Sequence, residues 1–322
     1  MALIEIKNLK KYYTTPRGLL HAVDDVTLDI EKGKTLGVVG ESGCGKSTLG
    51  KTLIRMEDST SGSIKFNGKE ITGMSQREFK PVRTQMQMIF QDPYASLDPR
   101  MSVSQLIAEP IQTYHLAKDK KELDDMVGAL MDEVGLARRL VNSYPHELDG
   151  GRRQRIGIAR ALSLNPEFIV CDEPVSALDV SIQAQILNLL MDLQAEKNLT
   201  YMFITHDMSV VKHISDDICV MYLGQVVEKA NYQELFINPM HPYAQALLSA
   251  IPVPSIHSKK ERIILKGEIT SPIDPKPCCR FAARCPYATD QCRETEPELK
   301  PVTGNPSHFV KCHRAEELAA AQ

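Results

Sequence analysis

Apolar residues in this chain fall into short runs that alternate with longer stretches of helical periodicity. The strand-like runs lie at 3–6, 26–30, 35–39, 85–90, 166–172 and 200–205. Helical periodicity lies at 48–55, 104–114, 121–134, 152–162 and 179–197. Strands that alternate with helices predict an α/β domain with a largely parallel sheet. The stretch from about 95 to 165 lacks a strand signal, which predicts an inserted helical subdomain.

The pattern changes after Ile251. Prolines at 252, 254, 272, 275 and 277 are typical of a linker or a loop-rich segment. The 322 residues suffice for a main domain of about 200–250 residues and a smaller one. Hydrophobic residues make up 43% and charged residues 25%, which are globular values. We therefore expect a main domain over 1–250 and a loop-rich C-terminal segment over 251–322.

Charge and hydropathy exclude several classes of protein. The net charge of −3 argues against a nucleic-acid binder that depends on a basic surface. No apolar run approaches the roughly 18–20 residues of a membrane span. The N-terminal residues 1–7 lack the layout of a signal peptide. These features predict a cytoplasmic location, so the eight cysteines need an explanation other than secreted disulfides.

The segment 40–47 reads Gly-Glu-Ser-Gly-Cys-Gly-Lys-Ser, between the apolar run 35–39 and the expected helix 48–55. This pattern predicts a loop that binds nucleotide phosphates. Glycines let backbone N–H groups turn toward phosphate oxygens, and the following helix adds its positive end. Lys46 can reach the terminal phosphates, and Ser47 can hold Mg²⁺. The expected ATP-binding residues here are Gly40, Glu41, Ser42, Gly43, Cys44, Gly45, Lys46, Ser47 and Thr48.

Polar residues follow three other predicted strands. Asp172 ends the run 166–172 and Glu173 follows it; Asp172 can join the Mg²⁺ shell and Glu173 can polarise water. Gln91 follows the run 85–90 and can hold Mg²⁺ or water, and His206 follows 200–205 and can contact a γ-phosphate. Taken alone, each is better explained as an acidic turn, a polar strand end or a histidine with a backbone partner. Their combination with the phosphate loop favours a catalytic set.

These elements appear in an order that resembles the ATP-binding subunits of ABC transporters over residues 1 to about 250. The phosphate loop, Gln91, Gly150–Gly151, Asp172–Glu173, Ser176–Asp179 and His206 match that family's Walker A, Q-loop, signature, Walker B, D-loop and H-loop. The resemblance implies a P-loop ABC ATPase fold and a head-to-tail pair of such domains. Each ATP then lies between one phosphate loop and the other chain's signature.

The same resemblance implies roles for single residues. Glu173, His206 and Lys46 are expected to be catalytic, and Ser47, Gln91 and Asp172 to coordinate Mg²⁺. Ser176 and Asp179 belong to the D-loop. Tyr13 stands where the family stacks an aromatic ring on adenine, with Tyr12 as the rival.

The signature departs from the family's usual Leu-Ser-Gly-Gly-Gln. It reads Leu148-Asp149-Gly150-Gly151-Arg152. Asp149 can cap the following helix as well as serine does, but an ionised carboxylate cannot donate to a γ-phosphate. We therefore predict that the site completed by this signature is weak or inactive, which favours a heterodimer. The alternative is that Asp149 is only a cap and turns away from phosphate.

Further residues narrow the resemblance to the oligopeptide, dipeptide and nickel importer group, and within it to the F type of ATPase subunit. These are His241-Pro242-Tyr243, the segment 175–181 and the segment 221–224, and the match extends to about residue 315. By itself, His-Pro-Tyr is only a turn that leads into a helix. The resemblance implies di- or oligopeptide import, with nickel or another small solute as an alternative.

The cysteines form a second cluster. Cys279, Cys285, Cys292 and Cys312 lie within a short Pro-rich stretch, where thiolates can hold a poorly cored segment together through a metal. Their wide spacing suits an iron–sulfur cluster at least as well as zinc. The resemblance implies a [4Fe–4S] cluster on these four; zinc and free thiols are the alternatives. Cys278 can replace Cys279, and His313 can replace Cys312, less well. Cys44, Cys171 and Cys219 are expected to be unliganded.

The expected function is therefore an ATP-hydrolysing importer subunit at the cytoplasmic face of the membrane. The resemblance implies a second, non-identical ATPase subunit, a pair of transmembrane permeases and, indirectly, an extracytoplasmic solute-binding protein. Two rivals stay open: an ABC ATPase of nucleic-acid repair or translation, and a regulatory subunit that binds ATP with little hydrolysis. The absence of a long coiled-coil insert and of a basic surface argues against the first, and Glu173 and His206 argue against the second.

Overall fold

The computed structural model describes residues 1–251, 262–265, 267 and 270–320. Pro252 and Pro254 of the predicted linker lie outside the described residues. Contacts divide the chain into two compact units, Met1–Gly73 with Phe203–Gln322, and Met74–Met202. Within the described residues, no helix is long and apolar enough to cross a membrane. The α/β class predicted from the apolar pattern is confirmed.

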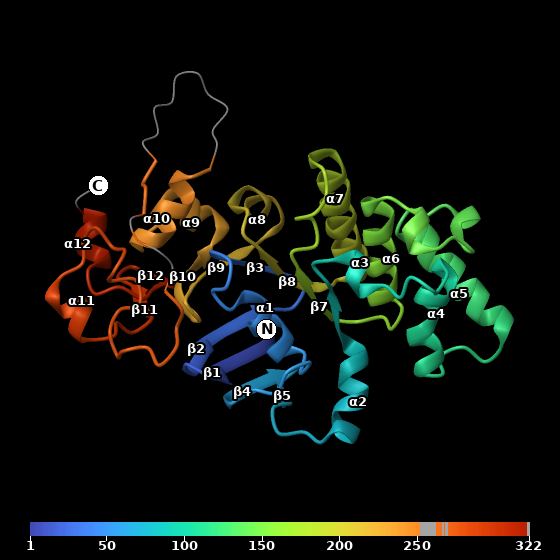
Figure 1. The fold of residues 1–322 in the computed structure, drawn as a ribbon, viewed down its shortest axis with the longest axis horizontal. Helices are drawn as coiled ribbons and strands as arrows, with labels where there is room; N and C mark the ends of the chain where they lie inside the picture. Colours follow the sequence, from blue (N-terminus) through green and yellow to red (C-terminus); the bar gives the residue numbers. More distant parts are fainter. Residues whose placement is uncertain (252–261, 266, 268–269, 321–322) are drawn as a thin grey trace. The chain divides into compact units, whose positions relative to one another are not determined.

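The first unit begins with an antiparallel sheet in the order β2-β1-β4-β5 (Figure 1). Its strands are β1 (Ala2–Thr15), β2 (Gly18–Glu31), β4 (Ser61–Phe66) and β5 (Lys69–Glu70). Alternation explains β2, where Val26, Leu28 and Ile30 are buried and the residues between them are exposed. β4 was not indicated by the sequence, because it begins with Ser-Gly-Ser and carries few apolar residues.

A second sheet in the same unit runs in the order β11-β12-β10-β9-β3, with β8 beside β3. Its strands are β3 (Thr35–Val39), β8 (Thr200–Thr205), β9 (Asp217–Tyr222), β10 (Gln225–Asn231), β11 (Lys300–Val302) and β12 (Asn305–Val310). β3 and β9 are parallel, with Val39 opposite Val220. All five residues of β3 are buried, as expected for a central strand.

The edge of this sheet is antiparallel, which corrects the prediction of a largely parallel sheet. β9 and β10 form a hairpin, and β12 and β11 continue it antiparallel. The physical reason is the two-residue turn, in which Leu223 and Gly224 both have positive φ, 44° and 84°. A turn of this kind joins only antiparallel strands.

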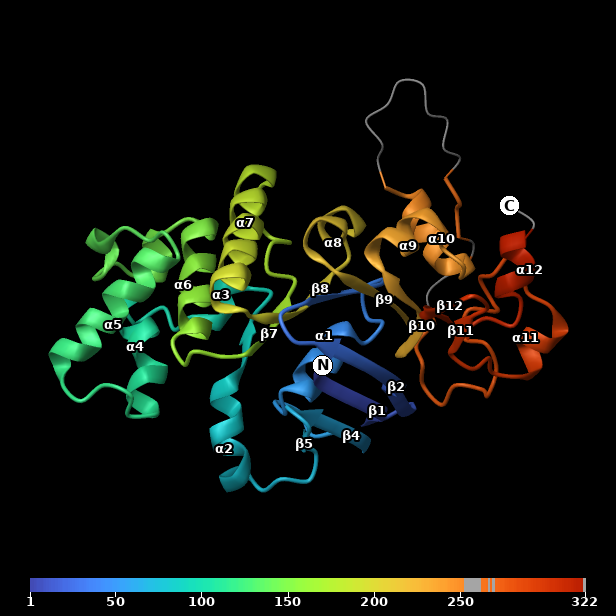
Figure 2. The same cartoon turned by 180° about the vertical axis from the view of Figure 1, so that it is seen from behind.

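Helices cover one face of the second sheet, where the core lies (Figures 1 and 2). They are α8 (Met208–Ile214), α9 (Tyr232–Ile237) and α10 (Pro242–Ser249). Val39, Val220 and Tyr222 from the strands pack with Val211, Leu235 and Tyr243 from the helices. Phe281 of the C-terminal segment joins the same cluster. The remaining helices of this unit are α1 (Lys46–Leu53), α11 (Asp290–Glu294) and α12 (Ala315–Ala320).

The second unit combines a parallel strand pair with helices. β6 (Met86–Ile89) pairs with β7 (Phe168–Asp172), with Ile89 opposite Cys171. The segment expected to be helical holds α3 (Pro93–Ser96), α4 (Val103–Thr113), α5 (Lys120–Glu133), the 3₁₀ turns Arg138–Leu140 and Pro145–Glu147, and α6 (Gly150–Leu162). α2 (Gln76–Gln85) and α7 (Val180–Lys197) flank them. α2 was not predicted, because only Phe79 and Val82 give it a buried face.

Candidate functional site

The predicted phosphate loop connects β3 to α1. Gly40 has φ 154° and Gly45 has φ 102°, which a side chain rarely tolerates. An added Cβ would lie 2.2 Å from the Met221 carbonyl oxygen at Gly40 and 2.0 Å from the Ala22 carbonyl oxygen at Gly45. These glycines are therefore required by both the backbone turn and the packing beneath it.

Lys46, the first residue of α1, is buried inside the loop. Its Nζ donates to the carbonyl oxygens of Gly40 at 2.7 Å and Glu41 at 3.1 Å. Cys44 is buried as well, and burial raises the pKa of its thiol, which therefore stays neutral. Ser42 and Gly43 are exposed at the tip of the loop. The ammonium group is thus placed where the loop's glycines would surround an anion.

The loop is held from below by the hairpin between β9 and β10. The Gly224 N–H donates to the Cys44 carbonyl at 2.8 Å, and the Asp24 N–H donates to the Gly224 carbonyl at 2.8 Å. The Asp24 carboxylate accepts hydrogen bonds from Tyr12 and Arg280 and contacts His21 at 3.1 Å. Burial opposes ionisation of Asp24, but these partners prevail and lower the pKa of its carboxyl.

The two tyrosines considered for adenine stacking lie in β1. Tyr12 stacks on His21 with 3.9 Å between ring centroids. Tyr13 donates its hydroxyl hydrogen to the Glu57 carboxylate, and the Lys11 ammonium lies 4.8 Å from its ring centroid. Tyr12 therefore already has a ring partner, whereas Tyr13 is held through its hydroxyl.

In the second unit, the parallel pairing of β6 with β7 brings two predicted residues together. The Gln91 amide nitrogen donates to the Glu173 carboxylate at 3.0 Å. Asp172, the last residue of β7, is buried. Glu173 has φ 44°, a left-handed backbone that is costly for a non-glycine residue and is concentrated at functional sites. Ser176 closes the turn after it, since its hydroxyl donates to the Glu173 carbonyl at 3.1 Å.

Asp149 and Asp179 cap the next two helices of this unit. The Asp149 carboxylate accepts the Arg152 N–H at 2.8 Å and lies 3.4 Å from the Arg152 guanidinium. Asp179 accepts the Ile182 N–H at 3.0 Å. Gly151 has a further reason to be glycine: an added Cβ would lie 2.7 Å from Cγ2 of Ile182 in α7. The absence of a side chain at Gly151 thus allows α6 to pack closely on α7.

His206 follows β8 in the first unit and is exposed. Its neighbour Asp207 caps α8 by accepting the Ser209 N–H at 2.7 Å. β8 lies beside β3 in the sheet, so His206 and the phosphate loop follow neighbouring strands.

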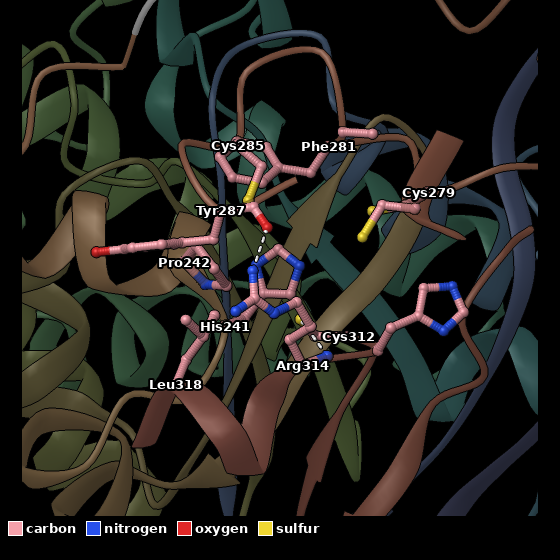
Figure 3. Close-up of a pocket in the computed structure, with 12 residues that line it drawn as sticks. His241, Pro242, Cys279, Phe281, Cys285, Tyr287, Cys312, Arg314 and Leu318 are labelled. Atoms are coloured by element: carbon pink, nitrogen blue, oxygen red, sulfur yellow. Dashed lines mark hydrogen bonds between the residues drawn. The ribbon is translucent and has the colours of Figure 1, made fainter. Parts of the chain in front are cut away.

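The four predicted cysteines line one small pocket of the C-terminal segment (Figure 3). Cys279, Cys285, Cys292 and Cys312 contribute to its wall together with His313, whereas the described Cys278 does not. Burial, followed by the neighbouring thiols, raises the pKa of Cys279 to about 12, so a metal would have to displace its proton. Burial likewise raises the pKa of Cys285 and of Cys312.

The arrangement does not support the predicted iron–sulfur cluster. Across the described residues, no group of three or more His, Cys, Asp or Glu side chains is arranged to hold a metal ion. The cavity measures about 10 Å³, room for about one water molecule. The donor chemistry fits a cluster, but the side-chain positions do not.

The His-Pro-Tyr element starts α10. His241 is fully buried and its Nδ1 accepts the Tyr243 N–H at 3.1 Å; burial lowers the pKa of its imidazole to about 3. Buried Glu228 in β10 accepts the N–H groups of Met240 and His241, both at 2.8 Å. The Tyr243 hydroxyl reaches the phosphate loop and accepts the Glu41 N–H at 2.8 Å. Nothing in the local sequence indicated this last contact.

In this α/β fold, a glycine-rich loop surrounds a buried lysine and joins strand β3 to helix α1. This arrangement defines a P-loop nucleotide-binding protein. The ABC transporter family matches residues 23–176, and the oligopeptide/dipeptide transporter C-terminal region matches 227–292. The oligopeptide transport ATP-binding protein OppF of Escherichia coli K12 is 51% identical over 98% of this chain and 94% of its own length. AppF of Bacillus subtilis 168, of the same description, is 51% identical over 97% of each chain.

Solved structures agree with this assignment. A dimeric post-hydrolysis state of the ATP-binding cassette MJ0796, bound to ADP and Pi, superposes with a TM-score of 0.66 and 28% identity over 71% of this chain and 98% of that one. The chain belongs to the ATP-binding proteins of ABC transporters, in the group with the oligopeptide/dipeptide C-terminal region. The ABC ATPase fold is confirmed, and the protein is an ATPase coupled to transport.

Proposed function

We propose that this chain is the ATP-hydrolysing subunit of an importer of di- or oligopeptides, and that it works at the cytoplasmic face of the membrane. The observation that carries the peptide assignment is the near full-length similarity to OppF and AppF, including the C-terminal region. The partners proposed are a non-identical ATPase subunit, a pair of permeases and, indirectly, an extracytoplasmic solute-binding protein.

The phosphate loop is proposed to hold the ATP triphosphate through backbone N–H groups of 40–48 and the Lys46 ammonium, with Tyr13 against adenine. Ser47, Gln91 and Asp172 would supply oxygen ligands to Mg²⁺, which neutralises phosphate charge when bound. The Gln91 amide nitrogen is engaged by Glu173, so its amide oxygen is the atom suited to the metal.

Glu173 is proposed to polarise the attacking water, and its hydrogen bond from Gln91 fixes the carboxylate for that task. Lys46 and His206 stabilise charge on the transferred phosphate. The partner's signature would complete this site. Asp149–Arg152 would in turn complete the site on the partner's phosphate loop, with the D-loop residues Ser176 and Asp179 at the interface.

The composite site that uses Asp149 is proposed to be degenerate. Two like charges about 4 Å apart repel by roughly 4 kcal/mol at an effective dielectric of 20, and a carboxylate cannot donate to phosphate. Arg152, which lies 3.4 Å from Asp149, offsets part of this repulsion. Asp149→Ser in the assembled complex should raise ATPase turnover or nucleotide affinity; an unchanged rate and affinity would instead leave Asp149 as a helix cap alone.

The transported solute is tested by uptake. Deletion of this chain's gene should abolish uptake of labelled tri- to pentapeptides in the native host, and the wild-type gene should restore it while Lys46→Ala does not. Loss of nickel uptake with normal peptide uptake would favour the nickel alternative. A complex that transports peptide when this chain carries Glu173→Gln would favour the regulatory role that Asp149 suggests.

The cysteine pocket is proposed to hold a [4Fe–4S] cluster, with zinc as the alternative, on the chemistry of its thiols alone; binding would require the four side chains to move, because their present positions do not fit a metal. Support comes from the four thiols that line the pocket and from Arg314, whose guanidinium lies in the same lining and donates to the Tyr287 carbonyl at 2.9 Å (Figure 3). A cation there would balance thiolate charge. Iron and sulfide analysis of anaerobically purified protein tests this, and stoichiometric zinc without iron would favour the alternative.

A further inference from the structure

The C-terminal segment makes a charged contact with the phosphate loop. The Arg284 guanidinium donates to both carboxylate oxygens of Glu41, at 2.6 Å and 3.0 Å. Only 8% of the Arg284 side chain and 25% of the Glu41 side chain are exposed. A two-pronged pair of this kind fixes both direction and distance, and water screens it less than an exposed pair.

A second contact fixes the backbone of the same residue. The Tyr243 hydroxyl accepts the Glu41 N–H at 2.8 Å, and the Tyr243 ring is fully buried. Its ring lies 4.8 Å from that of Tyr222 and 5.5 Å from that of Phe281, centroid to centroid. Arg284 of the C-terminal segment therefore holds the side chain of Glu41, and Tyr243 of α10 holds its main chain.

The chemistry of the phosphate loop explains why these contacts with Glu41 matter. Every other charged or dipolar group of the loop favours an anion: the Lys46 ammonium, the backbone N–H groups and the start of α1. Glu41 is the exception, since an unpaired carboxylate beside a triphosphate repels it. Arg284 cancels that charge and keeps the carboxylate turned toward the C-terminal segment.

We propose that Arg284 is a positioning residue for ATP binding, which neutralises Glu41 and holds it clear of the phosphates, and that Tyr243 sets the Glu41 backbone. This inference rests on the proposed role of the phosphate loop. It gives the C-terminal segment a part in nucleotide affinity, separate from any contact with ATP.

The test is ATP binding to the purified full-length chain, measured with fluorescent ATP, ADP and AMP analogues. Arg284→Gln should weaken ATP about tenfold and AMP by less than about twofold, because repulsion grows with the number of phosphate charges. The loss should increase at low salt. In the Glu41→Gln background, Arg284→Gln should change ATP affinity by less than about twofold, because no charge is left to neutralise. Arg284→Lys should retain part of the affinity.

Two controls separate the possible failures. Arg293→Gln removes a 59% exposed arginine from the same segment and should leave all three affinities unchanged. Lys46→Ala should abolish ATP binding; if it does not, the proposed phosphate site itself is wrong. If Lys46→Ala abolishes binding but Glu41→Gln fails to suppress the Arg284→Gln defect, or Arg284→Gln has no effect, Arg284 is a structural brace and the inference is overturned.

Discussion

At the scale of single residues, the candidate site is built from contacts between neighbours in space. The Gln91 amide holds the Glu173 carboxylate at 3.0 Å, and the left-handed backbone of Glu173 sets where that carboxylate points. The Lys46 ammonium is held inside the loop by hydrogen bonds to the carbonyl oxygens of Gly40 and Glu41. Each group therefore has its orientation before ATP arrives, which reduces the ordering that binding requires.

Glu173→Gln tests the assignment of the base. The substitution keeps the size of the side chain and removes its capacity to take a proton, so kcat of the assembled complex should fall by about 10²–10⁴-fold. ATP affinity should stay within a factor of about three, because the triphosphate contacts are unchanged. A rate within tenfold of wild type would show that another group polarises the water.

Asp24→Asn tests the charge network below the loop. The substitution leaves Arg280, which is 5% exposed, without its anionic partner, and should cost about 3 kcal/mol of unfolding free energy at pH 7. The pKa of Asp24 is lowered by folding, so its stabilisation is present above the unfolded value of about 3.9 and is lost as pH falls through the folded value.

The difference between Asp24→Asn and wild type should therefore shrink as pH falls below about 4–5 in urea titrations. Asp58→Asn, at a side chain that is 80% exposed, is the matched control and should change stability by less than about 0.5 kcal/mol. An equal penalty at every pH would show that the charge of Asp24 is not what stabilises the network.

At the scale of elements, caps and glycines decide how helices meet the site. Asp149 caps α6 and Asp179 caps α7, and the two helices approach each other where Gly151 faces Ile182. His241 caps α10, and its backbone N–H donates to the Glu228 carboxylate. The signature, D-loop and His-Pro-Tyr motifs therefore also stabilise the helices that follow them.

Gly151→Ala should separate α6 from α7. Its Cβ would lie 2.7 Å from Ile182 Cγ2, and overpacking of this kind costs about 1–3 kcal/mol of unfolding free energy. Ile182→Ala removes that methyl group, so the double variant should lose less than the sum of the singles. Gly157→Ala in the same helix is the control; no described atom crowds that position, and it should stabilise by about 0.5–1 kcal/mol. Additive losses would exclude the clash.

At the scale of the whole molecule, the site described in one chain is half of the proposed catalytic arrangement. In the proposed dimer, the signature that contains Asp149 would serve the other subunit's nucleotide, and in a homodimer both composite sites would contain this carboxylate. A non-identical partner with a serine in that place leaves one site intact. The asymmetry of the transporter would then follow from a single residue.

Sedimentation of the Glu173→Gln chain with ATP tests this asymmetry. Alone the chain should remain monomeric at micromolar concentration, and with its partner ATPase it should form a one-to-one dimer. Glu173→Gln combined with Asp149→Ser should gain a homodimer, because the repulsion is removed. A stable homodimer of the chain with Asp149 intact would contradict the proposal.

Features that depend on residues close together in the sequence were predicted, and those that depend on distant residues were not. The phosphate loop was predictable because its spacing, its strand and its helix are contiguous. The Gln91–Glu173 contact was not predicted; it follows from the parallel pairing of β6 with β7, which brings the residues after both strands to one edge. The antiparallel edge of the sheet was missed, since β11 has only three residues and β12 lies far along the chain from β10. The Arg284–Glu41 contact joins residues 243 positions apart, and local patterns carry no information about such pairs.

The hydrogen bond from the Glu41 N–H to the Tyr243 hydroxyl has a practical consequence. An amide proton held by a buried acceptor exchanges slowly with solvent, and it becomes exposed when the acceptor withdraws. Deuterium uptake at Glu41 therefore reports on whether α10 is docked against the phosphate loop, without a dye or a substitution. A fragment that ends before α10 would lack that protection, and its nucleotide affinity would describe a different loop from the one in the full-length protein.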